Sequence, residues 1–130
     1  MDENVPVRVL VSDDEDDIRA LVGLAVAKAG CTVVASVADG AAALRSARAG
    51  LPDLAVLDVS MPGATGLEVC AELRADPLTA GIGILLLSAG ASADDVARGL
   101  AAGADAYLAK PFAVTALVQQ VRALSERQPA

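Results

Sequence analysis

Apolar residues in this chain form two kinds of segment, short continuous runs and longer stretches with helical spacing, and the two kinds alternate. The run over residues 54–57 is short and wholly apolar, as is typical of a parallel strand covered on both faces. Ile18, Leu21, Val22 and Ala25 stand at i, i+3, i+4 and i+7, the spacing of one buried helix face. The pattern predicts strands over residues 7–12, 31–37, 54–57, 82–87 and 106–109.

A helix is predicted after each of these strands. Asp39 is expected to cap the second helix, and Gly30, Gly50 and Gly103 to end the first, second and fourth. The third helix closes before Pro77. The apolar residues that mark the third and fifth helices are Leu67, Cys70 and Leu73, then Val114, Leu117, Val118, Val121 and Leu124. Regular strand–helix alternation implies right-handed crossovers, and it therefore predicts an α/β fold with a doubly wound parallel sheet.

Length and composition indicate one folded domain. The chain has 130 residues, of which 55% are hydrophobic and 21% charged, and this composition excludes a disordered polar chain. We expect a single domain over residues 1–130, with a core from about 7 to 124 and with 125–130 as a tail or a truncated linker. No apolar stretch approaches the ~20 residues that span a bilayer. Residues 1–4 are acidic, unlike a signal peptide, so a soluble cytoplasmic protein is expected.

The net charge, the absence of histidine and the two cysteines limit the kinds of binding site and active site that are expected. A formal net charge of −7 argues against direct binding to nucleic acid or to an anionic membrane. The chain has no histidine, which excludes a Ser-His-Asp triad, a Cys-His pair and any histidine metal site. A metal ion here must be a hard cation held by oxygen ligands. Cys31 and Cys70 lack CxxC spacing and are interpreted as small buried apolar residues.

Four of the apolar runs end on polar side chains suited to phosphoryl chemistry. The first run leads into Asp13 and Asp14, the third into Asp58, the fourth into Ser88 and the fifth into Lys110. In an open parallel sheet the carboxyl ends of the strands share one edge, where ligands bind. Three carboxylates, a hydroxyl and an ammonium are therefore expected to meet in one small site.

These residues lie within longer motifs that together resemble the receiver domain of bacterial two-component response regulators. The resemblance covers residues 7 to about 124 and implies a flavodoxin-like fold with five helices around a five-stranded sheet of order 2-1-3-4-5. The motifs that carry it are Asp13-Asp14, then Asp58 with Met61-Pro62-Gly63 and Gly66, then Ser88-Ala89, and then residues 103–112.

The resemblance implies that Asp58 is the phosphoacceptor, whose carboxylate attacks a phosphoryl group and forms an acyl phosphate. It also implies a Mg²⁺ site made by Asp14, Asp58 and the backbone carbonyl of Ser60, with Asp13 acting through water. Glu15, Asp16 and Asp17 extend the acidic run. We interpret those three as solvated residues that favour the helix start.

Further roles follow from the resemblance. Lys110 reaches the phosphoryl oxygens, and its peptide bond to Pro111 is expected to be cis. Ser88 donates its hydroxyl to the phosphoryl group, and Ala89 lies against that group. Tyr107 is expected to move inward when the domain switches, although a half-buried core tyrosine is the alternative.

The surface of the fourth helix, fifth strand and fifth helix sets expectations for partners. Receivers of the winged-helix DNA-binding subfamily dimerise there through charged pairs, of which only Asp105 remains in this chain. Uncharged residues hold the other positions, and the loop over 74–81 is longer than in that subfamily. We therefore disfavour a winged-helix partner and expect a monomer or a weak dimer with an unknown output. The uncharged positions are Val96, Ala106, Ala116 and Gln120.

The predicted function is a phosphoryl-accepting switch, and other functions remain open. A sensor histidine kinase or a phosphotransfer protein supplies the phosphoryl group, because this chain has no histidine. One alternative is an interaction module on the same fold that is not phosphorylated. An aspartate-nucleophile phosphohydrolase is less favoured, because residues 12–15 do not supply Asp-x-Asp. A nucleotide-binding enzyme is weaker still, because residues 81–83 precede a strand and do not open a helix.

Overall fold

The computed structural model describes residues 5–127, and strands and helices alternate along all of them. This alternation confirms the predicted fold class, and most element bounds lie within a residue or two of those expected from the pattern. The elements are β1 (Arg8–Ser12), α1 (Asp16–Lys28), β2 (Thr32–Val37), α2 (Gly40–Gly50), β3 (Leu54–Asp58), α3 (Gly66–Ala75), β4 (Gly83–Ser88), α4 (Ala93–Ala101), β5 (Ala106–Ala109) and α5 (Val114–Glu126).

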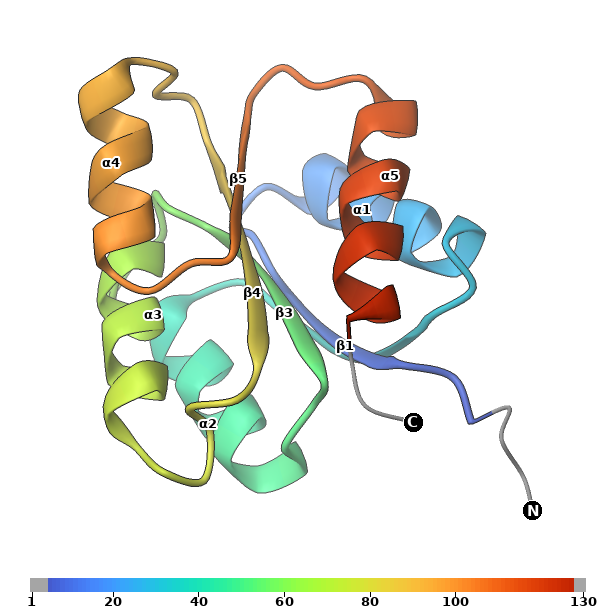
Figure 1. Cartoon of the computed structure of the whole chain (residues 1–130), viewed down its shortest axis with the longest axis horizontal. Helices are drawn as coiled ribbons and strands as arrows, with labels where there is room; N and C mark the ends of the chain where they lie inside the picture. The colour runs from blue at the N-terminus through green and yellow to red at the C-terminus, as the bar shows by residue number, and fades with distance from the viewer. Residues whose placement is uncertain (1–4, 128–130) are drawn as a thin grey trace.

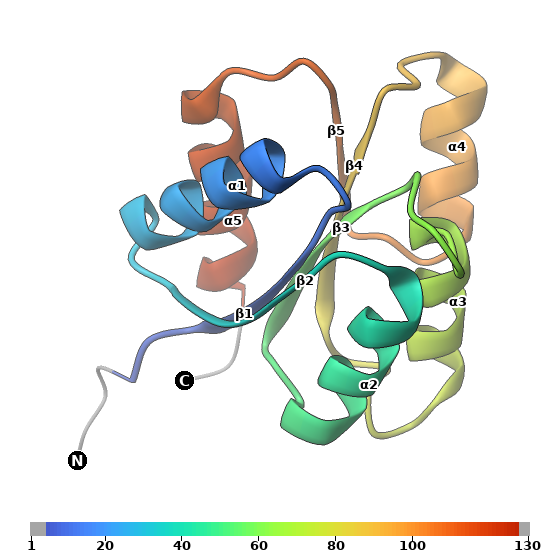
Figure 2. The ribbon, with the colours of Figure 1, turned by 180° about the vertical axis from the view of Figure 1, so that it is seen from behind.

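The five strands form one parallel sheet in the order β2-β1-β3-β4-β5, which confirms the expected topology. Helices α1 and α5 cover one face of the sheet, and α2, α3 and α4 cover the other (Figures 1 and 2). Every residue of β3 and β4 is buried, because these central strands have helices on both sides. Strand β2 lies at the edge and alternates between exposed and half-buried residues.

Alternation along the strands divides the core into two parts. Val9 and Val11 of β1 pack on the side of α1 and α5, whereas Leu10 between them packs on the side of α2 and α3. Cys31 belongs to the first part and Cys70 to the second, and both are buried free thiols as expected. The two-sided core holds the strands firmly, so the residues at their carboxyl ends are placed by a rigid frame.

The local sequence predicted the residue that caps the start of α2, but not the contacts at the end of that helix. Asp39 caps α2 as predicted, since its side chain accepts a hydrogen bond of 2.8 Å from the backbone N–H of Ala42. Helix α2 ends at Gly50 as expected, but the left-handed residue that follows is Leu51, with φ 46°. The guanidinium of Arg8 donates to the carbonyls of Gly50 and Leu51 at 2.9 and 3.2 Å, which satisfies the end of that helix.

At its C-terminal end, α5 continues to Glu126. Ser125 and Glu126, which belong to the tail or truncated linker expected over 125–130, are thus helical. Its last residues, 128–130, lie outside the described part of the chain.

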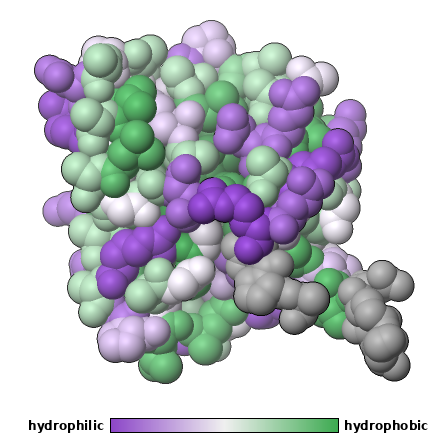
Figure 3. All heavy atoms as spheres, viewed as in Figure 1, coloured by the Kyte–Doolittle hydropathy of each residue, from purple (hydrophilic) through white to green (hydrophobic). Residues whose placement is uncertain are grey.

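On the surface, large apolar side chains are spread over several elements. Hydrophobic residues gather over α4 at the upper left of Figure 3, and Leu100 of that helix is 50% exposed. Within residues 5–127, none of the helices has the length and apolar character needed to cross a membrane. The other exposed large apolar residues are Val5, Leu24, Val34, Leu51 and Leu78.

Candidate phosphoryl site

The carboxyl ends of β1, β3, β4 and β5 place the predicted site residues side by side. Backbone hydrogen bonds continue one step past the strands: the N–H of Asp13 donates to the carbonyl of Val37 at 3.1 Å, and that of Lys110 to Ser88 at 2.7 Å. Asp58 and Ser88 are the last residues of β3 and β4. The strand ladder itself therefore sets where these side chains start.

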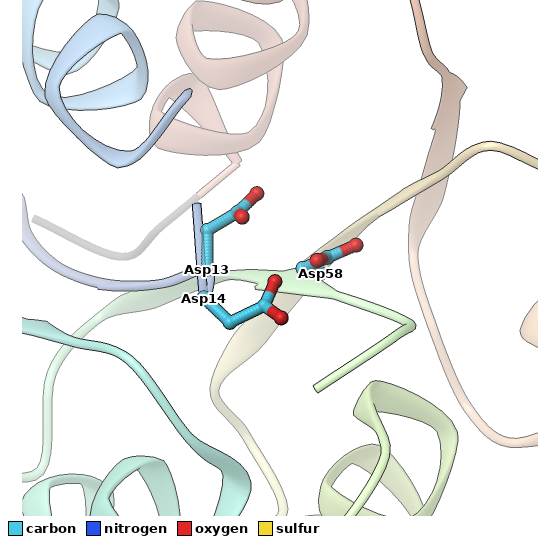
Figure 4. Close-up of side chains that lie close together, drawn as sticks. All are labelled: Asp13, Asp14 and Asp58. Carbon is cyan, nitrogen blue, oxygen red and sulfur yellow. The ribbon is translucent and has the colours of Figure 1, made fainter. Parts of the chain in front are cut away.

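Three carboxylates meet at this edge. One carboxylate oxygen from each of Asp13, Asp14 and Asp58 lies within 4.8 Å of the other two (Figure 4). Asp13 and Asp58 are buried and Asp14 is exposed. The backbone N–H of Glu15 donates to Asp13 Oδ1 at 2.9 Å, which fixes the Asp13 side chain. A set of hard oxygen atoms at this spacing fits Mg²⁺ or another hard divalent cation.

Burial makes Asp58 an unusual carboxylic acid. Desolvation, reinforced by the negative charge of Asp13, raises the pKa of Asp58 to about 6, and the ammonium of Lys110 offsets only part of this effect. The backbone N–H of Ser60 donates a long hydrogen bond of 3.4 Å to Asp58 Oδ1. Burial therefore disfavours the charged form of Asp58, which becomes the main form only as the pH rises past about 6.

Lys110 lies among the acidic groups. Its Nζ is 3.0 Å from Asp13 Oδ2, 3.3 Å from Asp58 Oδ1 and 3.4 Å from Glu15 Oε1. Burial by itself lowers the pKa of Lys110, but the hydrogen bonds and charges of Asp13 and Asp58 outweigh burial and raise it. The ammonium is therefore charged and held close to the candidate nucleophile. The Lys110–Pro111 peptide bond is cis, the form that the resemblance implies.

Glu15 is a member of the site that sequence reasoning missed. Asp16 and Asp17 do lie in the first turn of α1, where acidic residues were expected, but Glu15 precedes the helix and turns to Lys110. No local signal separates Glu15 from its acidic neighbours, because the contact joins residues 95 positions apart. The cavity at this edge has a volume of about 260 Å³, and the residues that line it are Asp14, Glu15, Asp58, Ser60, Ala89 and Lys110.

Close backbone packing supports Asp58 from behind. A Cβ atom at Gly66 would lie 2.4 Å from the carbonyl oxygen of Asp58, so any other residue there would push α3 away from the end of β3. The N–H of Gly66 donates to the carbonyl of Val59 at 2.9 Å. Met61 is buried over the end of β1, where its Sδ accepts a hydrogen bond of 2.9 Å from Ser12 Oγ.

Ser88 and Tyr107 meet at the loop that follows β4. The backbone N–H of Gly90 donates to Ser88 Oγ at 3.0 Å, and the hydroxyl of Tyr107 donates to the carbonyl of Gly90 at 2.6 Å. The tyrosine ring is half-buried and packs against the core part beneath α2 and α3. One residue, Gly90, thus connects the two side chains for which a role in switching was predicted.

The amino-acid sequence matches a known family. The family pattern described as the response regulator receiver domain matches residues 9–122. The chain belongs to the response regulator receiver domain family. As a receiver domain it is a phosphoryl-accepting switch of two-component signalling, which confirms the predicted function class.

Individual proteins of this family are similar to the chain in sequence and in structure. It is 45% identical, over 93% of its length, to the transcriptional regulatory protein PrrA of Mycobacterium bovis, of which it covers 51%. It resembles the signal receiver domain of NarL from Mycobacterium tuberculosis, with 36% identity and a TM-score of 0.87, over 95% of this chain and 98% of that one. It also resembles the chemotaxis response regulator CheY4 of Vibrio cholerae, with 32% identity, a TM-score of 0.85, and coverage of 92% and 99%.

The chain thus spans about half the length of the curated relatives that it matches.

Proposed function

We propose that Asp58 is the phosphoacceptor of this receiver domain. One carboxylate oxygen attacks the phosphorus of the donor in line; the new O–P bond forms as the bond from phosphorus to the donor breaks, and the bonding electron pair leaves with the donor. The observation that carries the proposal is the position of the buried Asp58 carboxylate, which lines the cavity at the end of β3 and lies 3.3 Å from the Lys110 ammonium.

The same site is proposed to hold Mg²⁺. Asp13, Asp14 and Asp58 supply the carboxylate oxygens, with Asp13 bound through water, and the backbone carbonyl of Ser60 supplies a further ligand. The convergence of three carboxylate oxygens supports this assignment, since such a cluster is otherwise repulsive. When bound, the cation neutralises negative charge on the transferring group and on its acceptor.

Lys110, Ser88 and Ala89 are proposed to contact the phosphoryl group after transfer. The Lys110 ammonium would exchange its contact with Asp58 for the phosphoryl oxygens, in the cavity that both residues line. Ser88 Oγ accepts a hydrogen bond from Gly90, so its own proton is free to be donated. Ala89 lines the cavity with a side chain too small to obstruct the group.

The donor is proposed to be a sensor histidine kinase or a phosphotransfer protein, because no residue of this chain can form a phosphohistidine. Chemistry catalysed by the domain itself is confined to phosphorylation and dephosphorylation of Asp58. Relatives such as PrrA are named transcriptional regulatory proteins, so an output that acts on transcription is one outcome for a longer protein.

The output signal is proposed to leave through the surface of α4, β5 and α5. Val96, Ala106 and Leu100 make its centre uncharged and partly exposed. Asp105 is engaged within the chain, at 2.9 Å from Arg74 and 3.9 Å from Arg127. That internal engagement supports a monomer or a weak apolar dimer over an ionic dimer.

Phosphorylation by a small donor tests the proposal. Acetyl phosphate and Mg²⁺ should add one phosphate that hydroxylamine removes, and Asp58→Asn should abolish the labelling. Asp17→Asn, an exposed change in the same acidic protein, is the matched control and should label normally. Equal labelling of parent and Asp58→Asn would refute the assignment of Asp58. A parent that takes no phosphate from any donor would favour the interaction module that is not phosphorylated.

A further inference from the structure

Gly99 lies in the last turn of α4 and is the buried residue of that helix. A Cβ atom at this position would lie 2.8 Å from Cδ2 and 3.1 Å from Cε2 of the Tyr107 ring, and 3.2 Å from Cδ1 of Leu86. The tyrosine ring thus occupies the space that any larger residue at 99 would fill. Glycine within a helix is unfavourable compared with alanine, so its presence here carries a cost that the packed ring offsets.

The packed ring connects three elements. Its hydroxyl donates to the carbonyl of Gly90 at 2.6 Å, and the N–H of Gly90 donates in turn to Ser88 Oγ. Helix α4, strand β5 and the loop that follows Ser88 therefore meet through one side chain. A displacement of the ring by about the radius of a methyl group would break the hydroxyl contact, because hydrogen bonds weaken steeply with distance and angle.

We propose that Gly99 is a positioning residue for Tyr107. Because residue 99 has no side chain, the Tyr107 ring packs directly against α4. In this position the ring hydroxyl holds the loop after β4 through its hydrogen bond to Gly90. This loop begins directly after Ser88 and carries Ala89, so the packed ring lowers the cost of ordering both residues around a phosphoryl group; only this last step rests on the proposed function.

A pair of glycine-to-alanine changes tests whether Gly99 provides the space for the Tyr107 ring. Gly23 in α1 is the matched control, since a Cβ atom there would meet only Val33 Cγ2, at 4.0 Å. Gly23→Ala should raise the folded-to-unfolded ratio by about fivefold, the ordinary gain from helix propensity. Gly99→Ala should lower that ratio, whereas the same change in a Tyr107→Ala background should raise it. A stabilising Gly99→Ala in the parent, equal to Gly23→Ala, would overturn the proposal.

Tyrosine fluorescence reports the position of the ring, and a change in stability alone would not alter it while the protein stays folded. The chain has one tyrosine and no tryptophan, so this signal comes from position 107 alone. In Gly99→Ala the fluorescence should become more accessible to acrylamide quenching, measured under conditions in which the variant is fully folded. It should be unchanged in Gly23→Ala. Unchanged quenching in both variants would show that the ring keeps its place without the glycine, and the proposal would fail.

Beryllofluoride, a mimic of the phosphoryl group, tests the link to the site. With Mg²⁺ present, its affinity for Gly99→Ala should fall at least about threefold below the parent, and Gly23→Ala should bind it like the parent. Equal affinities in all three proteins would refute the coupling. A parent that binds no beryllofluoride and takes no phosphate would refute the proposed function instead. The stability and quenching measurements would still test whether Gly99 positions the Tyr107 ring.

Discussion

The raised pKa of Asp58 predicts an inverse dependence of stability on pH in the absence of metal ions. The ordinary value is 3.8 and the folded value is about 6. Between these two values the unfolded chain has already released the proton that the native chain retains. The native state therefore binds more protons than the unfolded state, and the free energy of unfolding falls as the pH rises.

The size of this effect follows from the same two values. A difference of about two pKa units corresponds to ~3 kcal/mol, fully lost above pH ~7, because each unit is worth about 1.36 kcal/mol. Asp58→Asn removes the titrating group while keeping a similar shape. The variant should therefore be more stable than the parent at neutral pH, and the difference should shrink as the pH approaches 4.

Urea denaturation of both proteins, in buffer with a chelator and at several pH values from 4 to 7.5, measures the difference directly. Other titrating groups, such as Asp95 with its lowered pKa, are present in both proteins and cancel. Unfolding free energies that run parallel over the whole range would refute the reasoning, since the burial of Asp58 would then carry no electrostatic cost. Added Mg²⁺ should restore the stability of the parent above pH 6 by binding the ionised native state.

Four further outcomes are expected. Asp14→Ala should lose the rise in Tm that Mg²⁺ gives the parent, and a chelator should abolish labelling by acetyl phosphate; a full Mg²⁺ response in the variant would contradict the metal site. Glu15→Gln should speed phosphorylation by this anionic donor a few-fold at low salt, with the gain absent at high salt and in Asp17→Asn, because a negative charge near Lys110 is removed. Arg74→Ala should lower the free energy of unfolding by about 2–3 kcal/mol, because its guanidinium bonds three backbone carbonyls and a carboxylate; urea denaturation should show no such loss for the exposed Arg45→Ala. Sedimentation with beryllofluoride and Mg²⁺ should show a monomer or a weak dimer, and a tight dimer that dissolves at high salt would contradict the uncharged output surface.

The fold and the centre of the site were predictable because they depend on periodic patterns and on one topological rule. Apolar runs of strand length alternate with helical spacing, and this alternation admits few topologies. The rule that parallel strands share a carboxyl edge then brings Asp13, Asp58 and Lys110 together, although residues 13 and 110 are 97 positions apart. The strand order itself came from the resemblance.

Features that depend on a single side-chain contact were not predictable. Leu51 adopts a left-handed conformation usually left to glycine, and only the folded chain shows that Arg8 satisfies the carbonyls beside it. The pattern assigns no contact to Gly99, since Gly103 is the glycine that it predicts to end this helix. Its function depends on the ring of Tyr107, which reaches α4 only when β5 lies beside it.

Glu15 shows that the charge of the site depends on which side chains the folded structure brings together, because the order of acidic residues along the sequence did not reveal its contact with Lys110. The acidic run suggests two ligands followed by solvated residues, but the folded site has four carboxylates, from Asp13, Asp14, Glu15 and Asp58, around the one ammonium of Lys110. Under the proposed function, a phosphoryl group on Asp58 would bring further negative charge into this space. On that proposal the site would accept the group when a divalent cation adds positive charge or when Lys110 is released from its carboxylate partners. The excess of acidic groups therefore makes the charge balance of the cavity sensitive to phosphorylation, and the loop joined to it through Ser88, Gly90 and Tyr107 is placed to respond.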